Sequence, residues 1–170
     1  MTAEAQERKA RKEAKMLERR AQLALSRQDH GGPLTWRGWF DGSAHPNPGK
    51  LGIGALLLGP NGERIEVSAA AGHGSSSDAE YAALTAVLQA ALKLRPPPVQ
   101  LLLHGDSQVV INDVLGTTPV GAKGLEVHRA SVVALLQQFN DVSLRWIPRH
   151  RNGEADRLSQ LAISNLAPEA

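Results

Sequence analysis

The chain has 170 residues, 42% hydrophobic and 21% charged, with a formal net charge of +2, which suits one ordinary globular domain plus a modest appendage. It contains no cysteine, which excludes disulfides, thiolate nucleophiles and cysteine-bound zinc or iron–sulfur sites, so any metal must be bound by oxygen or imidazole. It also lacks the run of about 18 apolar residues that a membrane span needs and the apolar core of a secretory signal, so we expect a soluble, cytoplasmic protein.

The first predicted element is a helix over residues 2–28, a stretch rich in Ala, Glu, Lys, Arg and Leu that contains no Gly or Pro. Residues 1–30 hold eight Lys/Arg against five Asp/Glu, a net of +3, which leaves the rest of the chain at −1. We therefore divide the chain into a basic helical arm with its linker, residues 1–32, and a globular body, residues 33–170. Charge patterning leaves open whether the arm is only a solvated helix or binds nucleic acid or self-associates.

Three strand-like segments follow, over residues 36–43, 52–58 and 64–71. The turn between the second and third contains Pro and an Asn-Gly pair, which predicts an antiparallel hairpin. Residues 44–49, Ala-His-Pro-Asn-Pro-Gly, are expected to form a loop longer than a tight hairpin requires. Long structured loops beside a strand often carry function.

The period of the hydrophobic pattern then changes from that of strands to that of helices. A helix is predicted from Ser77 to Leu94, before a triple proline, and a buried strand from Val99 to His104. The remaining predicted elements are helices over 107–115, 125–139 and 152–165 and a strand over 142–146. This alternation predicts an α/β fold with a mixed sheet, antiparallel at its start and parallel later, flanked by helices.

Four carboxylates occupy positions that the elements would bring together. Asp41 ends an apolar strand and Asp106 follows another through one glycine, whereas Glu80 and Asp156 lie in the first turns of predicted helices, where the helix dipole favours negative charge. If the two strands are neighbours, the four side chains gather and repel one another unless a hard dication neutralises them. Oxygen ligands suit Mg²⁺ or Mn²⁺, and two such ions can activate water and stabilise the leaving oxygen in phosphodiester hydrolysis.

Each carboxylate also has a purely structural interpretation. Ser77-Asp78-Ala79-Glu80 fits a capping box, in which Glu80 would bond the Ser77 backbone amide. Asp156 would favour the dipole of its helix, and Asp41 and Asp106 would be turn residues or caps. Only the four together favour a metal site over these alternatives.

At these residues the sequence resembles type 1 ribonuclease H, from about residue 36 to residue 162. Residues 39–49 (Trp-Phe-Asp-Gly-Ser-Ala-His-Pro-Asn-Pro-Gly) resemble the family's first strand and substrate loop, and residues 79–84 its helix with the catalytic Glu. Residues 105–110 and 152–158 resemble the segments with the third and fourth carboxylates. The resemblance implies a ribonuclease H-like fold, with a five-stranded sheet of three antiparallel and then two parallel strands.

The family also implies an activity, which is endonucleolytic hydrolysis of the RNA strand of RNA/DNA hybrids by a two-metal-ion mechanism, with Mg²⁺ or Mn²⁺, that leaves 5′-phosphate and 3′-hydroxyl ends. By positional resemblance Asp41 bridges both ions. Glu80 and Asp106 hold one ion, and Asp156 holds the other. The positions that match the family's contacts to the 2′-hydroxyl side of the minor groove are Gly42, Ser43, Asn47, Glu80 and Gln108.

The substrate positions depart from the family pattern in places. Ser76 and Ser77 stand where many members have Asn, and serine has a shorter reach. Gly42, Ser43 and Asn47 also have a structural interpretation as turn-forming residues. Gln108 likewise fits a solvent-facing position on a helix. Residues 117–124 are too short for the basic handle of many bacterial members, so the arm is a candidate replacement, because phosphate neutralisation supplies much of the affinity.

A mobile histidine near the last Asp helps product release in many members, and Trp146 occupies that position here. His150 either plays a similar part or is an exposed loop residue. Residues 146–149, Trp-Ile-Pro-Arg, are followed by Asn152 and by Ala-Asp at 155–156. This order resembles a branch of the family that lacks the usual loop. Two alternatives stay open, which are a catalytically weak or inactive binding module of the same fold and another nuclease of the wider superfamily.

Overall fold

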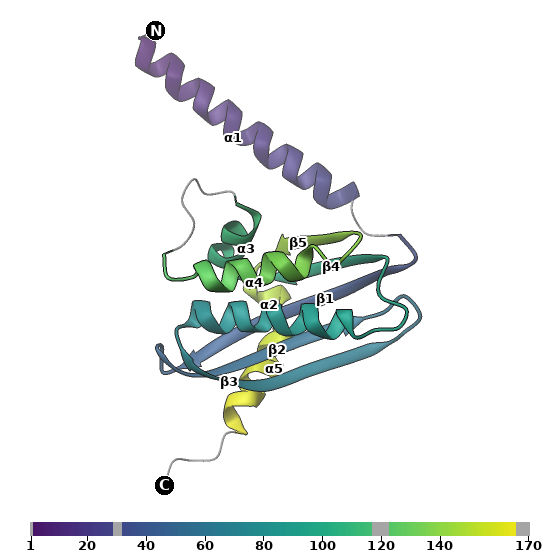
Figure 1. The fold of residues 1–170 in the computed structure, drawn as a ribbon. Helices are drawn as coiled ribbons and strands as arrows, with labels where there is room; N and C mark the ends of the chain where they lie inside the picture. The colour runs from purple at the N-terminus through teal and green to yellow at the C-terminus, as the bar shows by residue number, and fades with distance from the viewer. Residues whose placement is uncertain (1, 29–31, 117–122, 166–170) are drawn as a thin grey trace. The chain divides into compact units, whose positions relative to one another are not determined.

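The computed structural model describes residues 2–28, 32–116 and 123–165 (Figure 1). Its elements in chain order are α1 (Ala3–Gln28), β1 (Thr35–His45), β2 (Gly49–Leu58), β3 (Arg64–Gly74), α2 (Ser76–Leu92), β4 (Gln100–Gly105), α3 (Gln108–Leu115), α4 (Glu126–Leu136), β5 (Val142–Trp146), the short 3₁₀ helix η1 (Arg149–Arg151) and α5 (Gly153–Ser164). The chain divides into two compact units, residues 1–32 and 33–170. Within the described residues, every helix is too short or too polar to span a lipid bilayer.

The sheet confirms the predicted architecture. Its strand order is β3-β2-β1-β4-β5, with antiparallel pairing among β1, β2 and β3 and parallel pairing from β1 to β4 and from β4 to β5 (Figure 1). The parallel strands need crossover connections, and helices supply them. Strand β1 therefore lies at the centre and joins the antiparallel and parallel halves.

The hydrophobic core lies mainly between the sheet and α2, with α4 packed against α2. Helix α5 packs on the opposite face of β1, β2 and β3. Two glycines permit these close approaches, because a Cβ at Gly42 would lie 2.2 Å from the Ala79 carbonyl oxygen and a Cβ at Gly54 would lie 2.2 Å from that of Ala155. The two helices that carry predicted site residues thus meet β1 and β2 where the strands have no side chains.

The loop predicted over residues 44–49 is shorter in the structure. Strand pairing continues to His45 opposite Lys50, so that only residues 46–48 connect β1 and β2. The ladder ends at Pro46 because proline has no backbone N–H to donate. Asp41 consequently lies inside β1, opposite Gly54, and not at the strand's end.

The start of α2 also differs from the predicted helix start at Ser77 and from the Ser77–Glu80 capping box that was the structural alternative for Glu80. Ser75, in an extended conformation, is the N-cap and forms a capping box with Asp78, the third helical residue. The run of three serines offered several possible caps, and the Asp three residues after Ser75 fixes the first. Glu80 therefore lies beyond the capping box and is available to the site. The predicted short loop at 117–124 lies largely outside the described residues.

Candidate functional site

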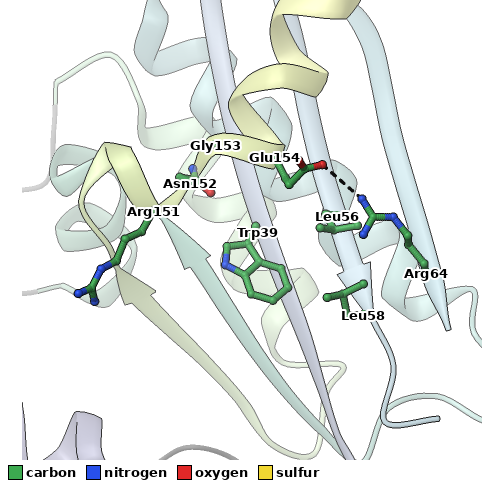
Figure 2. A pocket seen from close by; sticks show the side chains of 8 residues that line it. All are labelled: Trp39, Leu56, Leu58, Arg64, Arg151, Asn152, Gly153 and Glu154. Atoms are coloured by element: carbon green, nitrogen blue, oxygen red, sulfur yellow. Dashed lines mark hydrogen bonds and ion pairs between the residues drawn. The ribbon is translucent and has the colours of Figure 1, made fainter. Parts of the chain in front are cut away.

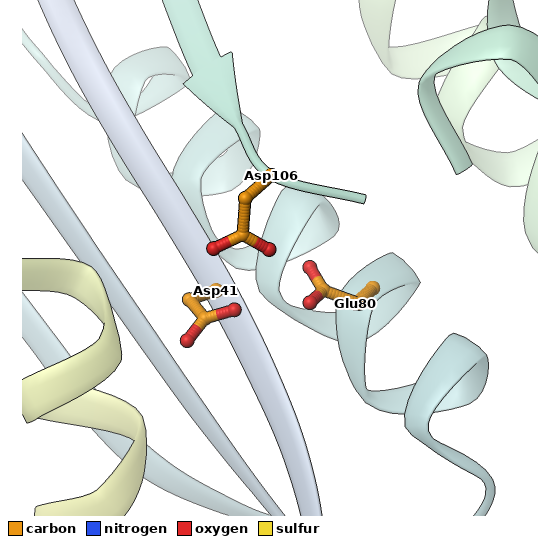
Figure 3. Close-up of side chains that lie close together, drawn as sticks. All are labelled: Asp41, Glu80 and Asp106. Carbon is orange, nitrogen blue, oxygen red and sulfur yellow. The ribbon is translucent and has the colours of Figure 1, made fainter. Parts of the chain in front are cut away.

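Three carboxylates converge beside the central strand. One ligand oxygen from each of Asp41, Glu80 and Asp106 lies within 4.8 Å of the other two (Figure 3). Asp41 comes from β1, Glu80 from α2, and Asp106 from the segment after β4. The structure thus brings together three of the four side chains that the sequence predicts as metal ligands.

Strand register explains why the two aspartates meet. The parallel pairing of β1 with β4 ends at Phe40 opposite Gly105, so the next residue on each strand is an aspartate. Glu80 reaches them from α2, whose first turns lie against Gly42. Asp41 and Glu80 are only 5% and 8% exposed, so water screens their mutual repulsion poorly.

The fourth carboxylate, Asp156, lies on α5 beside Asp41. The Ser159 hydroxyl is 2.9 Å from the Asp156 carbonyl oxygen and 3.4 Å from Asp41 Oδ2, so this serine links the two residues. Asp156 Oδ1 is buried and has no hydrogen-bond partner among the described residues. The negative charge of Asp156 also acts on Asp41, raising the Asp41 pKa.

The electrostatics of the cluster oppose full ionisation. Burial raises the pKa of Asp41 to about 7, and although the hydrogen bond with Glu80 lowers it, the charges of Asp106 and Asp156 raise it further. Burial, followed by the charge of Asp41, raises the pKa of Glu80 to about 10, against a smaller lowering by the Gly42 backbone. Protons therefore stabilise the cluster wherever no cation does so.

The donor set fits a hard dication. Glu80 Oε2 and Asp156 Oδ1 are both buried without a hydrogen-bond partner in the described residues, although buried carboxylate oxygens are normally satisfied. Oxygen-only ligation and a dense negative charge match the preferences of Mg²⁺ and Mn²⁺. The cluster is therefore able to hold a metal ion.

Two positioning residues were not predicted from the sequence. Asn152 is 1% exposed, and its Nδ2 donates to the Phe40 carbonyl at 2.9 Å and to Asp106 Oδ2 at 3.1 Å. Ser159, which is fully buried, also accepts a hydrogen bond from Ser43 at 3.1 Å. A small polar residue one turn after Asp156, on the same helix face, was the available signal for Ser159.

Of the predicted substrate residues, Asn47 and Ser76 are joined by hydrogen bonds in the structure. Asn47 contacts Ser76 twice, from Nδ2 to the serine hydroxyl at 3.3 Å and from the Ser76 backbone N–H to Oδ1 at 3.1 Å. This joins the β1–β2 loop to the start of α2. Ser77 is half-buried in the first turn of α2, and Gln108 is exposed at the start of α3.

His150 lies in η1, is exposed, and has no hydrogen-bond or ion-pair partner within the described part of the chain. The same segment adjoins a hollow of about 460 Å³ on the α5 side of the sheet (Figure 2). Its lining residues are Trp39, Leu56, Leu58, Arg64, Arg151, Asn152, Gly153 and Glu154. Because Asn152 also bonds Asp106, the hollow lies next to the carboxylate cluster.

All four carboxylates lie within the part of the chain that matches known proteins. Residues 39–162 match the family model described as reverse transcriptase-like. Ribonuclease HI of Halobacterium salinarum is 32% identical over 143 residues, which cover 84% of this chain and 70% of that protein. A bifunctional protein of Mycobacterium tuberculosis is 33% identical over 132 residues, which cover 76% of this chain but only 36% of that protein.

Solved structures of RNase H1 proteins also resemble this chain. The crystal structure of RNase H1 from Halobacterium salinarum has a TM-score of 0.71 at 31% identity and covers 78% of this chain and 99% of that chain. LC11-RNase H1 in complex with RNA/DNA hybrid has a TM-score of 0.68 at 26% identity, covering 76% of this chain and 96% of that chain. This chain therefore has the fold of proteins with these names.

Proposed function

The chain belongs to the ribonuclease HI family, and on that basis we propose that it hydrolyses the RNA strand of RNA/DNA hybrids endonucleolytically, leaving 5′-phosphate and 3′-hydroxyl ends. The observation that carries the proposal is the convergence of Asp41, Glu80 and Asp106 within 4.8 Å, with Asp156 alongside. A relative of the same fold has been crystallised with RNA/DNA hybrid. Residues 33–170 form the catalytic domain in this proposal.

The four carboxylates would hold two divalent cations, Mg²⁺ or Mn²⁺. Asp41 would be the central ligand, because it interacts with Glu80, Asp106 and Asp156 alike. When bound, the cations supply positive charge at the scissile phosphate and lower the pKa of an attacking water. The chain's own contribution is a fixed set of acceptors, with Asn152 orienting Asp106 and Ser159 orienting Asp41.

Substrate positioning is assigned to the surface around the β1–β2 loop. Asn47 and Ser76 are exposed or half-buried and already joined by hydrogen bonds, so they present a preformed polar edge. Gly42, Ser43, Ser77 and Gln108 complete the assigned contacts to the minor groove, where a 2′-hydroxyl distinguishes RNA from DNA. His150 is exposed beside the site and is assigned to product release.

The test is cleavage of a labelled hybrid by the purified full chain with Mg²⁺ or Mn²⁺. Neutralising the four carboxylates one at a time, as Asp41→Asn, Glu80→Gln, Asp106→Asn and Asp156→Asn, is expected to lower kcat by more than about a hundredfold, since even indirect ligand supports cost about 10- to 100-fold. Asp141→Asn, at an exposed position, is the matched control. Undiminished cleavage by Asp41→Asn would disprove the assignment.

Substrate competition separates this proposal from its alternatives. Preference for the hybrid over duplex DNA, duplex RNA and single strands supports ribonuclease H activity. Preference for another substrate points to a different nuclease of the superfamily. Tight hybrid binding without cleavage in either metal would identify a binding module that keeps the fold.

A further inference from the structure

One face of the sheet combines aromatic rings and basic side chains next to the carboxylate cluster. Side chains two residues apart on a strand share a face, so Trp39 lies on the same side of β1 as Asp41, about 7 Å along the strand. Strand register places His104 opposite Trp39, and Arg145 opposite His104. Helix α5 packs on β1, β2 and β3.

The two rings pack against each other. Trp39 and His104 are stacked, with ring centroids 5.1 Å apart and an interplanar angle of 16°. Burial lowers the pKa of His104, the hydrogen bond with the Gly38 backbone opposes this, and the neighbouring positive charges of Arg145 and Arg37 lower it further. The His104 Nδ1 lies 2.9 Å from the Gly38 carbonyl, which fixes the ring in place. Trp39 is half-buried and forms one wall of the hollow shown in Figure 2.

Arginine side chains lie around these two rings. Arg64, at the far rim, is balanced by Glu66 at 2.8 Å and Glu154 at 3.3 Å. Arg151, on the other rim, is exposed and has no ion pair in the described residues. Arg37 and Arg145 also lie close to the two rings, since both act on the His104 pKa. The chain outside the first 30 residues is nearly neutral overall.

We propose that this surface, named here the tryptophan face and made of Arg37, Trp39, His104, Arg145 and Arg151, binds an unpaired stretch of nucleic acid that continues from the hybrid in the active site. Aromatic platforms with basic borders suit single strands, because every base has a face that can stack and every phosphate a charge that Arg can neutralise. The inference rests on the proposed function, which places a nucleic-acid strand at Asp41. Asn152 lines the hollow and donates to Asp106 at 3.1 Å, so the face and the cluster adjoin.

The experiment compares two hybrids that differ only in an unpaired extension. Fluorescence anisotropy with the full chain in EDTA, where no cleavage occurs, gives Kd for a blunt hybrid and for the same hybrid with its RNA strand extended by about six nucleotides. The extension, tested at the 5′ and the 3′ end in turn, is expected to lower Kd about tenfold at one of them, since stacking of even one base gives a gain of that order.

Variants assign that gain to the tryptophan face. Trp39→Leu and Arg151→Gln are expected to reduce it to about twofold or less, whereas Trp39→Phe, which keeps an aromatic ring, retains most of it. Lys93→Gln removes an exposed charge at the end of α2, which packs on the other face of the sheet, and is expected to change nothing. Should Trp39→Leu fail to fold, Arg151→Gln carries the test, because Arg151 is exposed.

Two results would overturn the inference, namely no gain from either extension in the parent chain, or the full gain in both Trp39→Leu and Arg151→Gln. Failure of the proposed function looks different. In that case the parent chain does not cut hybrids in Mg²⁺ or Mn²⁺, while the extension still tightens binding in EDTA through Trp39 and Arg151.

Discussion

At the scale of single residues, the support of Asp106 rests on one buried amide. Asn152 Nδ2 donates to Asp106 Oδ2 at 3.1 Å and to the Phe40 carbonyl at 2.9 Å, so it joins α5, β1 and the end of β4. Asn152→Ala is expected to weaken Mn²⁺ binding by about 10- to 100-fold, because the carboxylate loses its orienting partner. Titration calorimetry measures this, with Asn140→Ala, at an exposed position, as the control. Equal Mn²⁺ affinity in the two variants would contradict the role.

The glycines are a second feature at this scale. Gly54→Ala would place a Cβ 2.2 Å from the Ala155 carbonyl oxygen, so α5 must move away from β2. We expect a loss of about 1–3 kcal/mol in the free energy of unfolding, measured by urea denaturation, as for other overpacked interiors. Gly153→Ala is the matched control, because a Cβ there meets nothing within 4 Å. Similar losses in both variants would show that close packing at Gly54 is not the cause.

At the scale of elements, a polar network ties α2, α3 and α4 together. Asp113 is 3% exposed, accepts a hydrogen bond from the Tyr81 hydroxyl and forms an ion pair with Arg129 at 2.6 Å. His128 stacks on Tyr81, with centroids 5.4 Å apart. Because Tyr81 follows Glu80 directly, the network fixes the helix turn that presents Glu80 to the site.

Arg129→Met tests that network. It removes the cation beside a buried carboxylate and is expected to cost about 3 kcal/mol of unfolding free energy, because the remaining charge is left partly uncompensated. Chemical denaturation measures the loss. Lys93→Met, a change of the same charge at an exposed position, is expected to cost less than about 0.5 kcal/mol. A loss in Arg129→Met no larger than in this control would exclude the ion pair as a stabilising contact.

The same scale explains what sequence could and could not predict. Periodicity and turn residues predicted every strand and the mixed sheet, because binary patterns are local and repeat over several residues. The positions of Asp41, Glu80 and Asp106 followed from motifs on those elements. Ser159 and Asn152 were missed because their roles depend on contacts across 118 and 46 residues of chain, which no local pattern records. The Ser77–Glu80 capping box, the structural alternative for Glu80, was wrong because adjacent serines compete for one cap.

At the scale of the whole molecule, residues 1–32 form a compact unit of their own. Among the described residues, the buried hydrophobic core draws its members from residues 40–162. A chain that begins at Pro33 is therefore expected to keep its melting temperature within about 2 °C. Because the arm carries the excess positive charge, the same deletion is expected to raise KM for the hybrid at low salt with kcat unchanged. A large fall in melting temperature would contradict the first expectation, and an unchanged KM would contradict the second.

The stability of the whole molecule should depend on pH and metal together. The pKa of Asp41 is raised from 3.8 to about 7 and that of Glu80 from 4.5 to about 10, so the folded state holds protons that the unfolded state has released. Stability is therefore complete below about pH 4 for these two groups and is lost as pH rises through the folded values. In EDTA, the melting temperature is expected to fall between about pH 5 and pH 8, and Glu80→Gln is expected to flatten that fall. Mg²⁺ binds only the folded cluster and replaces the protons, so its stabilising effect grows with pH. Calorimetry across this range would contradict the account if stability in EDTA rose with pH, or if Mg²⁺ stabilised the protein equally at both ends.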